Sequence, residues 1–183
     1  MGDRTGKVYP LTKLVAVRRR LRRQGKKVVF TNGCFDLLHA GHVRLFHKAK
    51  KLGDVLIVAL NSDASVRRLK GPNRPIFPLR ERFEILAALA GVDYLTSFGE
   101  PTPQKTIAAL RPDVLAKGGD WGPFEIIGRS EVEAAGGRVV RVPYFKGHST
   151  SALIRKIVRS QAGPKKKPVS PLPSGDHRRA HRA

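Results

Sequence analysis

Two histidines, His39 and His42, stand three residues apart in the stretch VVFTNGCFDLLHAGHVRLF, residues 28–46. An apolar run ends at Gly33, and a helical pattern opens at Gly41. Side chains at positions i and i+3 lie on one side of a helical turn, and the first turn presents unpaired N–H groups and a positive dipole end. The two imidazoles are therefore suited to donate hydrogen bonds to phosphate oxygens. That chemistry is electrostatic stabilisation of a transition state rather than nucleophilic catalysis.

The glycines of this stretch support the phosphate interpretation, because Gly33 and Gly41 would let a phosphate approach the backbone. Other interpretations stay open: two surface histidines without a function, or a metal site that includes His47. The metal site lacks a carboxylate at helical spacing and a companion cysteine. Cys34 has only Asp36 as a neighbouring base, so a small buried thiol is the simpler interpretation. The sequence contains no Walker loop and no G-x-G-x-x-G after a strand.

Apolar runs and helical patterns alternate along the chain and must position these residues. We expect strands over residues 27–33, 54–63, 93–98, 113–120 and 137–144, and helices over 11–25, 41–53, 78–92, 102–112 and 149–160. The strands are continuous apolar runs, which is typical of a parallel sheet covered on both faces. The sequence thus predicts an open, doubly wound, Rossmann-like α/β fold with a parallel five-stranded sheet. Such folds bind ligands at the carboxyl ends of their strands.

The 183 residues suffice for one domain. We expect an irregular lead-in over residues 1–10, a folded domain over 11–160 and a basic disordered tail over 161–183, which has too little apolar content to fold. No apolar run is long enough to span a membrane, and the N-terminus has no signal pattern. A single cysteine fits a reducing compartment, so a cytoplasmic location is expected.

The formal net charge of +22 suggests a nucleic acid or another anionic surface as a partner. The basic residues gather in two places, around residues 18–27 and in the C-terminal tail. No RRM, KH or helix-turn-helix pattern accompanies them. A nucleic-acid-binding protein is therefore the least favoured function, and nucleic-acid contact is expected through the tail if at all.

The stretch TNGCFDLLHAGHVRLFHKAKKLGD resembles the H-x-G-H nucleotidyltransferase superfamily. Further elements follow in the order NSD, LKG-x-x-RP, KGGD and STS-x-x-I, and they are most similar to the heptose-1-phosphate adenylyltransferase branch. The resemblance covers about residues 11–158. One difference is that Ser151 stands where the branch usually has a threonine, and both side chains carry a hydroxyl.

The resemblance implies a reaction in which ATP and D-glycero-D-manno-heptose 1-phosphate give ADP-heptose and pyrophosphate. A sugar-phosphate oxygen attacks the α-phosphorus in line, with no covalent enzyme intermediate. Mg²⁺ is expected as a cofactor held mainly by the phosphates, so no protein metal ligand is expected. The implied partners are a separate upstream kinase and a second copy in a homodimer, with no membrane. The alternative is a cytidylyltransferase that acts on glycerol 3-phosphate or a similar small phosphate.

The resemblance also implies roles for single residues. The expected catalytic residues are His39, His42 and Lys70. The expected nucleotide-binding residues are Thr31, Asn32, Gly33, Phe35, Gly41, Arg82, Lys117, Gly118, Gly119, Asp120, Ser149 and Thr150. The expected acceptor-binding residues are Asp36, Asn61 and Asp63. Structural alternatives stay open for some of them: a solvated Lys70, a helix-capping Asp36, a surface ion pair for Arg82, and simple helix caps for Ser149 and Thr150. Trp121 is expected to wall the pocket or to lie in the core.

Overall fold

A parallel sheet of five strands forms the centre of the protein. The computed structural model describes residues 6–119, 126–143 and 150–161. The strands are β1 (Val28–Gly33), β2 (Val55–Asn61), β3 (Tyr94–Phe98), β4 (Val114–Gly118) and β5 (Arg138–Val142). Their order across the sheet is β3-β2-β1-β4-β5, and all four pairings are parallel. The predicted doubly wound α/β fold is confirmed.

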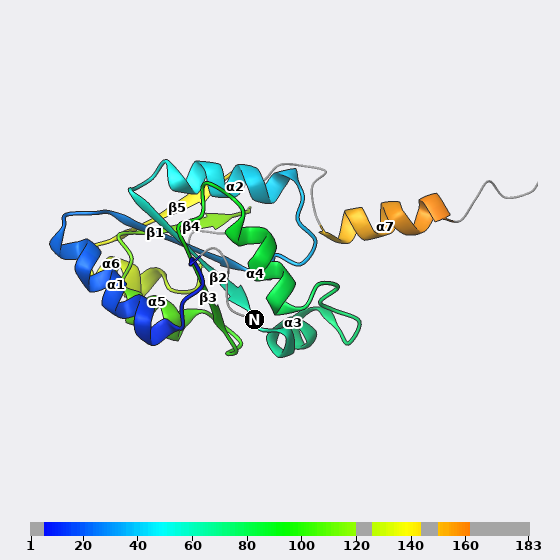
Figure 1. Ribbon diagram of the computed structural model, residues 1–183, viewed down its shortest axis with the longest axis horizontal. Coiled ribbons are helices and arrows are strands. Elements are labelled where there is room, and N and C mark those ends of the chain that lie inside the picture. The colour runs from blue at the N-terminus through cyan, green and yellow to red at the C-terminus, as the bar shows by residue number, and fades with distance from the viewer. Residues whose placement is uncertain (1–5, 120–125, 144–149, 162–183) are drawn as a thin grey trace, which may run out of the picture.

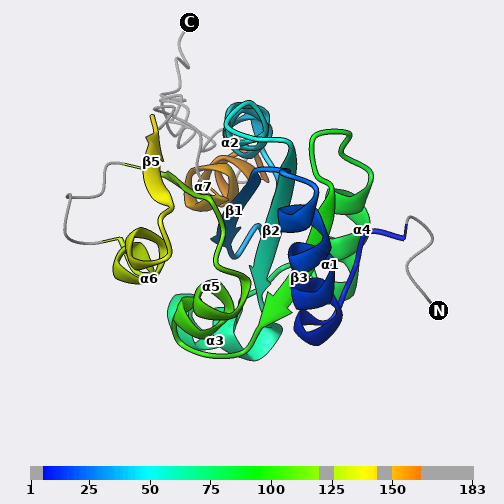
Figure 2. The same ribbon diagram turned by 90° about the vertical axis from the view of Figure 1, so that its left-hand side faces the viewer.

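Helices cover both faces of this sheet. The helices of the described part of the chain are α1 (Leu11–Arg23), α2 (Ala40–Lys50), α3 (Asp63–Lys70), α4 (Leu79–Ala87), α5 (Gln104–Leu110), α6 (Arg129–Ala134) and α7 (Thr150–Gln161). Figure 1 shows α2 on one side of the sheet and α1, α5 and α6 on the other. In Figure 2 the sheet runs from β5 at the left to β3 at the right. Each strand contributes side chains to the core on both sides of the sheet, because successive side chains along a strand point to opposite faces. Thus Val29 packs in the core layer of α2 and α4, and Phe30 packs in the layer of α1 and α5.

Three aspartates fix the amino-terminal ends of the strands. Asp54 accepts the backbone N–H of Lys27 at 2.7 Å. Asp93 accepts that of Leu56, and Asp113 accepts that of Val28, both at 2.7 Å. Each carboxylate precedes one strand and bonds the start of another chain segment at the same edge. These bonds satisfy donors at the end of the ladder and hold the register of the sheet.

The structure adds two helices that the sequence did not predict. Helix α3 follows β2 directly, and its N-cap Ser62 accepts the backbone N–H of Ser65 at 3.2 Å. Helix α6 has only six residues. The lead-in is also less irregular than expected, because Val8 forms an isolated parallel bridge with Leu95 of β3.

Helix α7 differs from the others in its packing. None of its residues is buried, and Figure 1 shows it extending away from the rest of the domain. The expected tail over residues 161–183 lies outside the described residues except for its first residue, which ends α7. In the part of the chain that the structure describes, no helix has the length and apolar character needed to cross a membrane.

Candidate active site

A cavity of about 300 Å³ opens at the carboxyl ends of β1, β4 and β5. The residues around it come from the end of β1, the start of α2, the ends of α3, β4 and β5, and the start of α7. They are Asn32, Phe35, His39, Gly41, His42, Leu45, Lys70, Lys117, Gly118, Gly119, Val142, Pro143, Thr150 and Ser151. Ten of the expected site residues thus share one cavity, at the sheet edge where parallel α/β folds bind ligands.

The two histidines lie face to face at the start of α2. His39 is the N-cap residue and His42 lies in the first turn, and their ring centroids are 3.8 Å apart with an interplanar angle of 23°. The ring of Phe35 meets His42 edge-on, with 5.3 Å between centroids. Phe35 has a φ of 43°, an uncommon conformation for a residue with a side chain, and it turns the chain between β1 and α2. The structure therefore brings the imidazole pair together as the spacing predicted.

Burial keeps His42 neutral. Desolvation, and after it the neighbouring His39, lowers the pKa of His42 from 6.5 to about 4. The Nδ1 atom of His42 is buried and has no hydrogen-bond partner among the described residues. A proton on that nitrogen would be an unsatisfied buried donor, so the tautomer that carries the proton on Nε2 is favoured. His42 is then a neutral donor whose accessible N–H can meet an anion in the cavity.

Two lysines add positive charge to the same cavity. Lys117, near the end of β4, donates from Nζ to Asn32 Oδ1 at 3.0 Å. Burial lowers the pKa of Lys117, while the nearby Cys34 opposes the shift. Lys70 is exposed at the last position of α3 and lines the cavity. Cations on two sides of a pocket that also holds a helix N-terminus favour a polyanionic ligand.

The glycines of the site have different roles. Gly41, Gly118 and Gly119 line the cavity, whereas Gly33 does not. A Cβ atom on Gly33 would lie 3.0 Å from the ring of Phe35, so this glycine serves close packing rather than phosphate approach. Thr31 is fully buried in β1 and also lies outside the cavity lining. The predicted nucleotide contacts of Gly33 and Thr31 stay predictions, for two residues that lie outside the cavity lining.

Arg82 lies outside the cavity lining, and its predicted phosphate contact stays a prediction. Its side chain is completely buried. Nε donates to the carbonyl of Phe77 at 3.0 Å, and Nη1 donates to the carbonyl of Cys34 at 2.6 Å. Nη2 donates to the carbonyl of Asn61 at 2.9 Å and to Asp63 Oδ1 at 2.7 Å. Arg82 thus joins the ends of β1 and β2 to the start of α4, and the alternative of a surface ion pair is excluded.

Asp36 holds a loop instead of lining the cavity. Its carboxylate is 1% exposed and forms an ion pair with Arg74 Nε at 2.5 Å. It also accepts the backbone N–H groups of Ile76 and Phe77 at 2.8 and 2.9 Å. A contact with an acceptor phosphate or a metal would require Asp36 to leave these partners. Asp36 therefore anchors this loop, and its predicted substrate contact stays a prediction.

The other two expected acceptor residues also lie outside the cavity lining. Asp63 accepts the backbone N–H of Leu79 at 2.9 Å and pairs with Arg82. It thus satisfies a donor in the first turn of α4, although it belongs to α3. Asn61 is buried and donates from Nδ2 to Ser65 Oγ at 3.0 Å. Both side chains organise the carboxyl end of β2. Their predicted contacts with the substrate stay predictions.

Thr150 lines the cavity at the start of α7, and its hydroxyl donates to the carbonyl of Leu37 at 3.3 Å. This bond connects α7 to the segment that precedes the histidines. Asp120, Trp121 and Ser149 lie outside the described residues. Cys34 is partly buried, and burial raises the pKa of its thiol against the opposing effect of Lys70 and Arg82. A raised thiol pKa disfavours the nucleophilic thiolate.

Four lining residues were not predicted. They are Leu45, Val142, Pro143 and Ser151. Leu45 stands one helical turn after Gly41, so helical spacing from the histidine motif could have found it. Val142 and Pro143 lie at the carboxyl end of β5. They could have been predicted, because ligands of such folds bind at the carboxyl ends of the strands. Ser151 belongs to the STS-x-x-I element, but the sequence predicted no contact for it.

The described lining offers nitrogen donors and hydroxyl groups but no carboxylate. Within residues 6–119, 126–143 and 150–161, no group of three histidine, cysteine, aspartate or glutamate side chains could hold a metal ion. Mg²⁺ prefers oxygen ligands, chiefly carboxylates, phosphates and water. These residues therefore fit a Mg²⁺ ion only where the ligand brings its own phosphate oxygens.

Known proteins are similar to this chain over most of its length. The bifunctional protein HldE of Syntrophotalea carbinolica is 55% identical over 137 residues, which are 75% of this chain and 28% of that protein. HldE of Citrifermentans bemidjiense is 52% identical over 158 residues, 86% of this chain and 32% of that protein. The chain thus spans about a third of the length of these relatives.

Solved structures show the same fold. A lipopolysaccharide core biosynthesis protein from Thermoplasma volcanium matches 68% of this chain and its own entire chain, with a TM-score of 0.56 and 32% identity. A pantoate-β-alanine ligase from Francisella tularensis shares the fold at a TM-score of 0.54 and 18% identity, over 84% of this chain and 79% of its own. The cytidylyltransferase-like family model matches residues 30–155, which include the histidine pair and both lysines of the cavity. The chain is therefore a member of the cytidylyltransferase-like family.

Proposed function

We propose that this chain transfers an adenylyl group from ATP to D-glycero-D-manno-heptose 1-phosphate, with ADP-heptose and pyrophosphate as products. The observation that carries the proposal is the stacked pair of His39 and His42 at the start of α2, in a cavity shared with Lys70 and Lys117. The HldE relatives, more than 50% identical over most of this chain, support the choice of reaction.

The reaction needs no nucleophile from the protein. An oxygen of the sugar phosphate attacks the α-phosphorus, and the bond from that phosphorus to the β-phosphate oxygen breaks as pyrophosphate leaves. Two polyanions must be held together, and negative charge on the phosphoryl oxygens must be stabilised. His42, neutral because burial lowers its pKa to about 4, donates its Nε2–H to such an oxygen. Each donor of this kind contributes roughly 10²–10³-fold to the rate in comparable sites.

The remaining lining residues bind and orient the phosphates. The amino-terminal end of α2 adds the positive end of a helix dipole beside the imidazoles. Lys117, fixed by its bond to Asn32, and the exposed Lys70 neutralise charge from two sides. Thr150 and Ser151 offer hydroxyl groups from the start of α7. Mg²⁺ supplies further charge neutralisation when it arrives with ATP, held by phosphate oxygens rather than by carboxylates of the lining.

The family model favours a second candidate by its cytidylyltransferase-like description, namely a cytidylyltransferase that acts on glycerol 3-phosphate. Gly118 and Gly119 at the end of β4 expose backbone groups beside the cavity, where a base can be recognised. Both bases use similar backbone contacts, so the choice between them requires a direct measurement. The adenylyl proposal is preferred because the HldE relatives match at more than 50% identity.

Pyrophosphate release by the full chain distinguishes the two candidates. The assay combines ATP or CTP with heptose 1-phosphate, heptose 7-phosphate, glycerol 3-phosphate and choline phosphate. Release with ATP and heptose 1-phosphate alone supports the proposal. Release with CTP and glycerol 3-phosphate supports the second candidate, and no release with any pair contradicts both.

The chemistry also defines neighbours of this reaction. A phosphorylating enzyme has to supply the sugar 1-phosphate, and a glycosyltransferase has to consume the nucleotide sugar. We place the reaction in the cytoplasm, where ATP is available, and we expect a homodimer. Sedimentation of the purified chain tests the dimer.

A further inference from the structure

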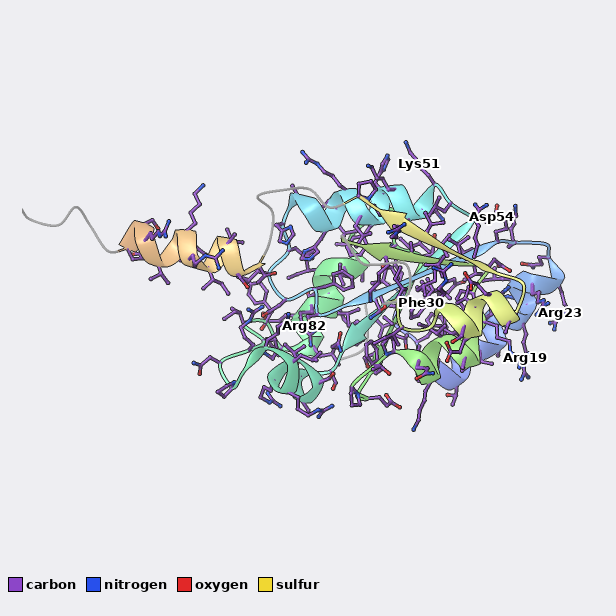
Figure 3. The ribbon with its side chains drawn as sticks, turned by 180° about the vertical axis from the view of Figure 1, so that it is seen from behind. Arg19, Arg23, Phe30, Lys51, Asp54 and Arg82 are labelled. Atoms are coloured by element: carbon purple, nitrogen blue, oxygen red, sulfur yellow. The ribbon has the colours of Figure 1, made fainter. Side chains whose placement is uncertain are left out.

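A second charged feature lies at the opposite end of the sheet from the cavity. We call it the basic end and define it by six exposed side chains: Arg19, Arg20, Arg22, Arg23, Lys27 and Lys51. Four of them come from the last turns of α1, Lys27 precedes β1, and Lys51 follows α2. Figure 3 shows Arg19 and Arg23 at one end of the molecule, away from Arg82, and Lys51 at the end of α2 on the other side of the sheet.

The carboxylates of this end are already occupied. Asp113 pairs with Arg18 at 2.9 Å, Asp93 pairs with Lys50 at 2.6 Å, and Asp54 lies 3.9 Å from Lys26. Each of these aspartates also accepts a backbone N–H at a strand start, as described above. None of the six side chains of the basic end forms an ion pair within the described residues. The acidic groups therefore leave the positive charge of this end uncompensated.

The surrounding sequence supplies no further carboxylate. Between Lys7 and Asp54 the only acidic residue is Asp36, which is buried against Arg74 near the other end of the sheet. The turn before β2 packs against the turn before β1, because Asp54 accepts the N–H of Lys27 and donates its own N–H to the carbonyl of Lys27. Lys51 thus lies at the same edge of the sheet as the arginines, on the side covered by α2. The four arginines fall within about one helical turn and act together, since the Debye length is about 8 Å at physiological salt.

The surface can recognise phosphate charge but little else. The apolar side of α1 is used in the core, where Leu14 and Leu21 are buried. No large hydrophobic side chain of the basic end is exposed in the described part of the chain, so nothing is available to insert into a bilayer or to stack on an unpaired base. Arginine and lysine side chains alone bind arrays of phosphates.

The arrangement of the cations fits a plane better than a groove. The four arginines fall within about one helical turn and fan over roughly 160° around the axis of α1. Basic side chains in a line along a helix axis would follow a nucleic-acid backbone. Basic side chains spread around the end of a helix instead point out from that end, toward a flat surface. Lys27 and Lys51 extend this end across the starts of β1 and β2. We propose that the basic end binds the phosphate headgroups of an anionic lipid surface and leaves the cavity facing away from it.

Vesicle co-sedimentation of the full chain tests this proposal. The vesicles contain phosphatidylcholine alone or with about 40% phosphatidylglycerol, at about physiological salt. We expect binding only to the anionic vesicles. Replacement of Arg19, Arg20, Arg22 and Arg23 by Gln should lower the partition coefficient at least about tenfold, because each basic residue near an anionic surface adds to the affinity. Pyrophosphate release and the melting temperature should stay within error of the original chain.

A matched control removes the same charge elsewhere, with Arg67, Lys105, Lys156 and Arg159 changed to Gln. This variant should keep vesicle binding within about threefold, because screening limits the reach of distant charges. Equal losses in the two variants would overturn the proposal, since binding would then follow total charge, including that of the C-terminal tail. Absence of vesicle binding by the original chain would overturn it as well. Tighter binding to a DNA or RNA duplex than to vesicles, lost in the arginine variant, would assign the surface to nucleic acid instead.

Discussion

Replacement of Arg82 by Met separates a structural arginine from a phosphate-binding one. Methionine keeps most of the buried volume but removes every donor. Three backbone carbonyls, those of Cys34, Asn61 and Phe77, and the carboxylate of Asp63 would lose a hydrogen bond. Loss of one member of a buried ion pair destabilises by about 3–5 kcal/mol. Asp63 is about a third exposed, so solvent relieves part of its charge, and we expect a loss near 3 kcal/mol.

The assay is urea unfolding followed by circular dichroism near neutral pH, together with the turnover of the folded fraction. Arg80→Met in the same helix is the matched control, because Arg80 is exposed and should change the free energy of unfolding by no more than about 0.5 kcal/mol. Arg82→Lys should fall between the two, since lysine keeps the charge but not the forked donors. An Arg82→Met protein that unfolds at the original urea concentration but has lost turnover would refute the structural role.

Three further predictions concern the cavity and its supports. The pKa of His42 is about 4 in the folded protein and 6.5 in the unfolded chain, so the free energy of unfolding should fall by about 3 kcal/mol as the pH drops from 6.5 to 4. His42→Gln should flatten this fall in acid unfolding curves, and an unchanged slope would contradict the prediction. Lys117→Met should weaken ATP binding about tenfold in a titration, and an unchanged affinity would contradict this prediction. The stability of the variant should stay equal or rise, because burial already disfavours the charged ammonium of Lys117. Asp36→Asn should lower the free energy of unfolding by about 3 kcal/mol and expose residues 74–77 to protease. Full stability together with lost turnover would instead support a substrate contact for Asp36.

Sequence patterns predicted the fold well because the strands are apolar on both faces. Runs such as VVF and VLIVAL have no polar side, and strands without a polar side are typical of a parallel sheet that helices cover on both faces. Helix α3 was missed because it follows β2 without a loop and carries three cations in eight residues. Its Ser62 cap and the acidic Asp63 in its first turn were available signals.

The site could be predicted only where local spacing determines the geometry. The relation of His39 to His42 is fixed within one helical turn, and their stacking follows from it. The roles of Asp36 and Arg82 depend on partners 38 to 48 residues away in the chain, Arg74 and Cys34. Spacing cannot show that a polar side chain will be used by such a distant segment. The scaffold contacts of Asp36 and Arg82 therefore became visible only in the structure.

The most direct test of the account is the rate of pyrophosphate release from ATP and heptose 1-phosphate by His42→Ala, compared with the exposed His47→Ala in the same helix. We predict a loss of roughly 10²–10³-fold in kcat for His42→Ala, with the fold intact by circular dichroism, and no change for His47→Ala. A near-normal rate for the folded His42→Ala protein would contradict the role of the imidazole pair.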